Sequence, residues 1–206
     1  MQPTERVFIV DDEADVREAV QLLIASAGLP AETYASAEAF LDAYQPDTPG
    51  CLVLDVRMPG MDGMVAQQTL RERGIDLPII FISGHGDIPM AVRAVQEGAL
   101  DFLEKPFNDD ALLDCINRGL EQDRHSRAEA AERAEVEACL KTLTPREREV
   151  MDKLVEGKVN KIIARELDAS TRTVEIHRAR VLQKMAVANA AQLVRRVAPI
   201  TDDGGD

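Results

Sequence analysis

The sequence predicts an α/β fold in the first part of the chain and an all-α fold in the last part. Up to about residue 120, short apolar runs alternate with longer stretches of helical period, the pattern of a parallel sheet covered by helices. After residue 143, short helical segments follow one another at tight turns. The charge divides at the same place, because residues 1–143 carry 12 basic and 27 acidic side chains, whereas residues 144–197 carry 12 and 7. An acidic module suggests cation or phosphate chemistry, and a basic module suggests nucleic acid.

Five strands are expected in the first part, and amphipathic stretches separate them. They lie near Arg6–Val10, Ala31–Tyr34, Cys51–Leu54, Ile79–Ile82 and Asp101–Glu104. Five strands in about 120 residues favour a flavodoxin-like doubly wound parallel sheet over the six-stranded Rossmann order. We therefore expect one domain over residues 1–120, with its ligand chemistry at the carboxyl ends of the strands.

A helical linker is expected over residues 121–143. The segment Glu121–Lys141 is rich in Ala, Glu and Arg and has no Gly or Pro, which favours a continuous helix. Its apolar residues keep a spacing of three and four, but Arg124 and Arg127 interrupt the apolar seam. A coiled-coil dimer and a solvated connecting helix both fit this pattern.

The third segment, residues 144–198, has the signals of a helix-turn-helix domain. Thr144-Pro145-Arg146-Glu147 fits a capping box with Pro at the first helical position. Further helix boundaries are expected at Gly157, Asn160, the Asp168-Ala169 turn, Ser170, Met185 and Asn189. The acidic, glycine-containing tail at 199–206 is expected to be disordered.

Several classes of protein are disfavoured by what the sequence lacks. The apolar runs are of strand length, far below the roughly 20 residues of a membrane span, so no membrane partner is expected. The N-terminus has no pattern of a secretion signal, which predicts a cytoplasmic location. The three cysteines form no CxxC pair, so we expect reduced thiols instead of disulfides or a zinc site.

Acidic side chains follow two of the predicted strands. Asp11 and Asp12 come directly after the first strand, and Asp55 comes directly after the third. If these strands are neighbours in a parallel sheet, the three carboxylates meet at one edge and repel one another. Oxygen ligands that retain water suit Mg²⁺, so a magnesium site is predicted.

A hydroxyl and an ammonium group are expected at the same edge. Ser83 ends the fourth strand, and Lys105 follows the fifth. Any one of these strand-end residues alone is weak evidence for a site, because a strand-end Asp is most often a helix cap and a Lys is most often a solvated surface charge. Together with the carboxylates, they supply the charge neutralisation that a transferring phosphoryl group requires.

The runs VDDE, LDVRMPGMDG, FISGHGD and DFLEKPF resemble, in order and spacing, the receiver domain of two-component response regulators. The resemblance implies that a sensor histidine kinase phosphorylates Asp55 and that Mg²⁺ is held by Asp11, Asp12, Asp55 and the backbone carbonyl of Arg57. It also implies that Ser83 and Lys105 contact the phosphoryl oxygens, that Phe102 is the aromatic switch residue, and that Lys105-Pro106 is a cis peptide.

Phosphorylation is expected to change the shape of the face formed by the fourth helix, fifth strand and fifth helix. The added charge draws Ser83 toward the phosphoryl group, and Phe102 then fills the vacated space. His85 lies two residues past Ser83. We expect it to be an exposed bystander, and a role in dephosphorylation or in donating to the phosphoryl group is the alternative.

The segment from Ser170 to Met185 is expected to be an amphipathic helix with Val174, Val181 and Met185 toward the core. Four residues are expected to face a major groove: Glu175, Ile176, Arg178 and Ala179. Four cations are expected to neutralise phosphates: Lys161, Arg172, Arg180 and Lys184. The alternative is a solvated basic helix face without a ligand.

The segment from LTPRERE to LQKM, residues 143–185, resembles the DNA-binding domain of the LuxR/FixJ class of transcription regulators. The resemblance implies that Ser170–Lys184 is the recognition helix and that the last helix, near Asn189–Val197, pairs two subunits. Asp168 stands where the family usually has a turn glycine, and Asp tolerates the left-handed conformation better than most residues. Glu175 and Ala179 replace basic groove contacts of several relatives, so base preference does not carry over.

Three functions are compatible with these residues to different degrees. The first is a phosphorylation-switched transcription factor that is not an enzyme, forms a homodimer when phosphorylated, binds double-stranded DNA and has RNA polymerase as a further candidate partner. The second is a hydrolase with an aspartyl-phosphate intermediate, which usually needs a second acid where Arg57 stands. The third is a DNA-binding protein whose first domain is read by a ligand or a protein without phosphorylation, and the complete pocket disfavours it.

Overall fold

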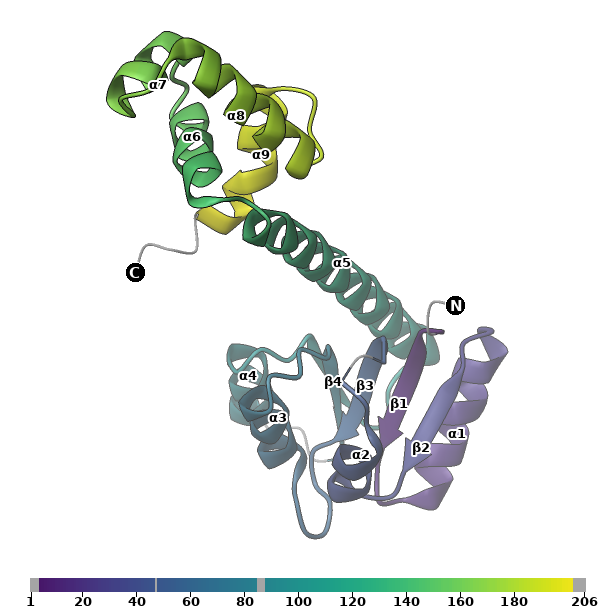
Figure 1. Cartoon of the computed structure of the whole chain (residues 1–206). Coiled ribbons are helices and arrows are strands. Elements are labelled where there is room, and N and C mark those ends of the chain that lie inside the picture. The colour runs from purple at the N-terminus through teal and green to yellow at the C-terminus, as the bar shows by residue number, and fades with distance from the viewer. Residues whose placement is uncertain (1–3, 47, 85–87, 202–206) are drawn as a thin grey trace. The chain divides into compact units, whose positions relative to one another are not determined.

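The structure is a computed structural model that describes residues 4–46, 48–84 and 88–201 (Figure 1). The chain divides into two compact units between Arg127 and Ala128, and each is described by itself. The sequence predicts disorder over residues 199–206. Residues 199–201 instead belong to helix α9, and residues 202–206 lie outside the described residues. His85 also lies outside the described residues.

The first unit alternates strands and helices, as the sequence predicts. Its elements are β1 (Arg6–Val10), α1 (Ala14–Ser26), β2 (Ala31–Tyr34), α2 (Ala37–Ala43), β3 (Gly50–Asp55), α3 (Gly63–Glu72), β4 (Ile79–Ser83), α4 (Ile88–Gln96), β5 (Asp101–Glu104) and the start of α5 (Asp109–Lys141). The strands are parallel and lie in the order β2-β1-β3-β4-β5. This order confirms the flavodoxin-like prediction and makes β1 and β3 neighbours.

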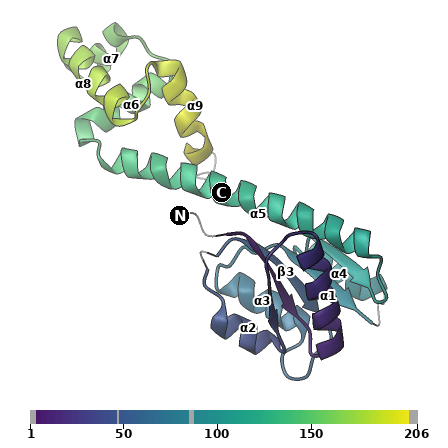
Figure 2. The ribbon, with the colours of Figure 1, turned by 90° about the vertical axis from the view of Figure 1, so that its right-hand side faces the viewer.

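Helices lie on both faces of the sheet (Figure 2). Alternate side chains of the strands are buried against the helices of one face or the other. Phe8, Leu54 and Phe81 face the core shared with α2, α3 and α4. Val53 and Ile80 face the core shared with α1 and α5. Because these strands are parallel, the carboxyl ends of β1, β3, β4 and β5 meet at one edge of the sheet.

The second unit is helical, with α6 (Pro145–Val155), α7 (Asn160–Glu166), α8 (Thr171–Lys184) and α9 (Ala190–Thr201). Thr144 forms the predicted capping box with Glu147, and Ser170 caps α8 by accepting from the Thr173 amide at 3.0 Å. Asp168 has a φ of 45°, so the turn keeps the left-handed conformation that glycine usually provides. These features confirm the predicted helix boundaries.

Helix α5 runs without interruption through the segment predicted as a linker, and each end belongs to the core of a different unit. Leu112, Ile116 and Leu120 are buried in the first unit. Val136 is 2% exposed and packs in the core of the second unit. The core of the second unit therefore begins before residue 144, because a helix of the predicted linker supplies part of its apolar surface.

Val136→Ala is expected to destabilise the second unit by about 1–3 kcal/mol, since it removes buried methyl groups and leaves a cavity. Val194→Ala on α9 is a matched control, because that side chain is 37% exposed and the same atoms are removed. Urea unfolding of the full chain, followed by hydrogen exchange at α6 and α8 amides, measures both. Equal, small losses of stability in the two variants would place Val136 outside the core.

Candidate functional site

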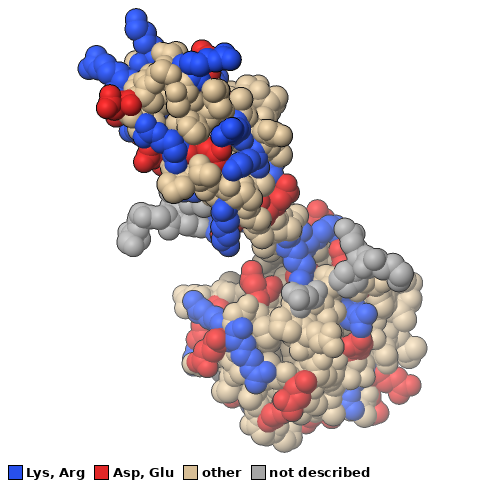
Figure 3. Space-filling view, viewed as in Figure 1, with Lys and Arg blue, Asp and Glu red and all other residues tan. Residues whose placement is uncertain are grey.

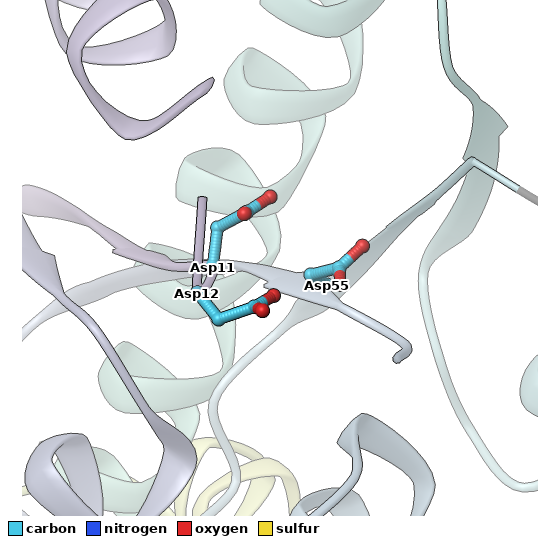
Figure 4. A group of neighbouring side chains, drawn as sticks. All are labelled: Asp11, Asp12 and Asp55. Carbon is cyan, nitrogen blue, oxygen red and sulfur yellow. The ribbon is translucent and has the colours of Figure 1, made fainter. Parts of the chain in front are cut away.

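Three carboxylates lie together at the carboxyl edge of the sheet, as predicted from the strand ends (Figure 4). Asp11 and Asp12 follow β1, and Asp55 is the last residue of β3. One oxygen from each of the three carboxylates lies within 4.8 Å of the others. Asp11 is fully buried and Asp55 is 4% exposed, whereas Asp12 is exposed to solvent. The cluster is thus an acidic site that opens to solvent at Asp12.

Lys105 reaches into this cluster from the end of β5. Its Nζ lies 2.6 Å from Asp11 Oδ2, 3.1 Å from Asp55 Oδ1 and 3.7 Å from Glu13 Oε1. Burial by itself would lower the pKa of Lys105, but the hydrogen bonds to Asp11 and Asp55 outweigh it and raise the pKa above its ordinary value. The ammonium group therefore stays charged beside the two buried carboxylates.

The pKa of the Asp55 carboxyl group lies above its ordinary value. Burial raises its pKa and the charges of Asp11 and Asp12 add to this shift, while the contact with Lys105 opposes it. A divalent cation near the three carboxylates would favour their ionised forms. The donor set fits such an ion, because carboxylate oxygens are the ligands that Mg²⁺ prefers and exposed Asp12 leaves room for water.

The other residues predicted for the pocket lie on β4, on β5 or shortly after a strand. Ser83 ends β4 and is 1% exposed, and its carbonyl accepts a hydrogen bond from the Lys105 amide at 2.8 Å. The Lys105-Pro106 peptide is cis, as the resemblance implied. Phe102 is half-buried on β5, with its ring centroid 6.5 Å from that of Phe81. Arg57, two residues after Asp55, is exposed.

This arrangement suits the transfer of an anionic group to Asp55. A buried carboxylate lies beside the Lys105 ammonium group, and the neighbouring carboxylates could hold a metal ion that neutralises incoming charge. Glu13 is not among the residues predicted for the pocket, and its carboxylate adds a further acid near Lys105. Its position in the sequence, directly after Asp11 and Asp12, is the feature that could have indicated it.

The second unit carries an exposed basic surface on α7 and α8. Lys and Arg side chains, drawn in blue, gather over this region in Figure 3. Lys161, Glu175, Ala179 and Arg180 are exposed, and the side chain of Arg172 is 84% exposed. Ile176, 44% exposed, lies among them on α8. Six of the eight residues predicted to contact DNA are therefore accessible to a ligand.

The other two predicted DNA contacts are held by residues of their own unit. Arg178 is half-buried and donates to Asn160 Oδ1 at 3.0 Å. Lys184 Nζ donates to Glu147 Oε2 at 2.7 Å and to the Thr142 carbonyl at 2.8 Å. Both side chains flank the buried face of α8, which brings them within reach of these partners, and helical spacing alone does not reveal such contacts.

Glu147 is a buried carboxylate whose main partner the sequence did not indicate. It is 2% exposed, and its hydrogen bonds to Lys184 and to the Thr144 amide lower its pKa to about 2. The capping box predicted the contact with Thr144, but no local signal marks a partner 37 residues away. The ion pair joins the start of α6 to the end of α8.

Within residues 4–46, 48–84 and 88–201, no helix combines the length and the apolar character needed to cross a membrane. Two family models match the chain. The response regulator receiver domain matches residues 7–117, and the luxR family of bacterial regulatory proteins matches residues 141–197.

Curated proteins and solved structures show the same likeness over nearly the whole chain. The transcriptional regulatory protein FixJ of Bradyrhizobium diazoefficiens is 42% identical over 92% of both chains. The response regulator protein TodT of Pseudomonas putida is 43% identical over 92% of this chain and 83% of its own. The structure of the response regulator StyR has a TM-score of 0.87 at 43% identity, covering 95% of this chain and 99% of that one.

Proposed function

The chain belongs to the response regulators with a LuxR-type DNA-binding domain, which control transcription, and we propose that phosphorylation of Asp55 is its switch. The receiver domain implies a histidine kinase as phosphoryl donor, and the LuxR-type domain implies double-stranded DNA as the target. The observation that carries the assignment of Asp55 is its place beside Lys105, 3.1 Å away, in the acidic cluster.

Asp55 acts as the nucleophile in this proposal. One of its carboxylate oxygens attacks the phosphorus of a phosphohistidine, an O–P bond forms as the N–P bond breaks, and the imidazole nitrogen keeps the electron pair. Lys105 holds a positive charge beside the arriving phosphoryl oxygens, and the Ser83 hydroxyl contacts them. Asp11, Asp12, Asp55 and the Arg57 carbonyl would hold Mg²⁺, which supplies further charge neutralisation.

The signal leaves the site through Ser83 and Phe102. The phosphoryl group draws Ser83 toward it, and the half-buried Phe102 ring moves into the space that opens. The face formed by α4, β5 and α5 then changes shape, and we propose that this change promotes a homodimer. The chain accepts the phosphoryl group on itself and has no multiple-turnover substrate in this proposal. We place it in the cytoplasm, where a kinase domain and DNA are both accessible.

Helix α8 is the proposed recognition helix. Lys161, Arg172 and Arg180 neutralise phosphates of the DNA backbone, and Glu175, Ile176 and Ala179 lie toward the bases. Arg178 and Lys184 instead stabilise the unit that presents this surface. A dimer with two such helices would bind paired half-sites, and contact with RNA polymerase is a further element of the proposal.

The coupling is tested by activating the full chain with acetyl phosphate, or with beryllofluoride, in the presence of Mg²⁺. Light scattering then gives the molar mass, and fluorescence anisotropy with a labelled operator gives the DNA affinity. We expect both mass and affinity to rise. If phosphorylated protein keeps the mass and affinity of the unmodified protein, the proposed switch is wrong.

A further inference from the structure

We propose that Glu38 of α2 is a positioning residue for the phosphoryl-acceptor site, because it fixes the loop that joins β3 to α3. The inference rests on the proposed function, since this loop follows Asp55 directly and contains Arg57, whose carbonyl is a proposed metal ligand. Glu38 Oε1 accepts a hydrogen bond from the Met61 amide at 2.8 Å. This contact links residues 23 positions apart in the sequence.

The loop approaches Glu38 closely at a point where only glycine fits well. Gly60 has a φ of 82°, a conformation that side chains rarely adopt. A Cβ atom at this position would lie 2.7 Å from Glu38 Oε1. The backbone at Gly60 and Met61 therefore packs directly against the carboxylate, and the contact depends on the local path of the loop.

The other end of the loop is fixed to the sheet. The Val56 amide donates to the Ile82 carbonyl at 3.0 Å, and the Gly63 amide donates to the Val56 carbonyl at 2.9 Å. Arg57 lies between the anchor at Val56 and the contact at Met61, and its own side chain is exposed. Glu38 thus restrains the part of the loop that the sheet does not hold directly.

Helix α2 provides a rigid base for this contact. Phe40 is 1% exposed, and its ring centroid lies 5.5 Å from that of Phe8 and 5.3 Å from that of Tyr44. Ser36 caps the helix by accepting from the Ala39 amide at 3.2 Å. A carboxylate on a helix fixed in this way can hold a loop in place, whereas one on a mobile segment would follow the loop.

The carboxylate is ionised at neutral pH. Hydrogen bonds from its own amide and from the Met61 amide lower the pKa of Glu38 below its ordinary value. A charged acceptor strengthens the hydrogen bond to Met61. Groups that orient metal ligands in this way typically change metal affinity by about 10–100-fold when they are removed.

Magnesium titration of the full chain tests the inference with three variants. Glu38→Ala removes the acceptor and the charge, Glu38→Gln removes the charge but keeps an acceptor oxygen, and Asp42→Ala removes an exposed carboxylate of the same helix. Isothermal titration with Mg²⁺ alone gives the dissociation constant, and thermal unfolding shows whether each variant is folded. We expect Glu38→Ala to weaken Mg²⁺ binding about tenfold, Glu38→Gln to weaken it less because it keeps a neutral acceptor oxygen, and Asp42→Ala to have no effect.

The outcomes separate this inference from the function on which it rests. If the wild-type chain binds Mg²⁺ and Glu38→Ala binds it with the same affinity, Glu38 has no positioning role and the metal site is intact. Equal weakening in Glu38→Ala and Glu38→Gln would show an effect of charge alone and would also overturn positioning. If the wild-type chain binds no Mg²⁺, the proposed receiver chemistry fails before Glu38 is tested.

Discussion

An Asp55→Asn variant will take up no phosphoryl group from acetyl phosphate and will show no phosphorylation-dependent gain in DNA affinity. An amide oxygen is a poor nucleophile, and the substitution leaves the volume of this buried side chain nearly unchanged. In the wild-type chain we expect activation to raise DNA affinity by a factor on the order of 5–150, the usual range of coupling between two sites. Intact mass spectrometry measures the phosphoryl group, and anisotropy measures the affinity.

Asp76→Asn is the matched control for this variant, because Asp76 is exposed and precedes the start of β4, at the opposite edge of the sheet from Ser83. It should be phosphorylated and activated like the wild type. Full regulated DNA binding by Asp55→Asn would instead support a receiver that is read by a ligand or a protein without phosphorylation. A phosphoryl group found on Asp55→Asn would place the acceptor at another residue.

The sheet and its acidic edge could be predicted from sequence because both follow from order along the chain. Each strand is a short apolar run, and the residue after a parallel strand must lie at the carboxyl edge. Asp11 and Asp55 therefore had to be near each other once β1 and β3 were neighbours. Lys105 entered the same cluster for the same reason, although its distances to the individual carboxylates follow from side-chain packing.

Contacts between distant elements could not be predicted, because periodicity shows which face of a helix is apolar and does not identify its partners. Glu38 meets Met61 across a loop, and Val136 joins a core whose other members lie later in the chain. The sequence predicts a DNA contact for Lys184 because it is a cation on a basic helix, but it does not indicate the partner of Lys184 on α6.

Lys184→Met is expected to lower the melting temperature of the second unit by several degrees without removing a DNA contact. The variant keeps an unbranched side chain but leaves Glu147 without its ammonium partner, and an unpaired buried carboxylate is costly. Arg180→Met is the matched control, because it removes one exposed cation from the same helix. It should leave the melting temperature unchanged and weaken DNA binding.

The salt dependence of DNA affinity and the pH dependence of stability distinguish a cation that contacts DNA from one that stabilises the second unit. The slope of the logarithm of DNA affinity against the logarithm of salt concentration should fall by about one for Arg180→Met and stay at the wild-type value for Lys184→Met. The pKa of Glu147 is lowered to about 2, so its contribution to stability is present above its unfolded pKa and is lost as pH falls from about 4.5 through about 2. Without Lys184 the pKa of Glu147 moves back toward its ordinary value, so the variant should lose less stability than the wild type over this interval. A Lys184→Met protein with wild-type stability and a reduced salt slope would return Lys184 to the DNA-binding surface.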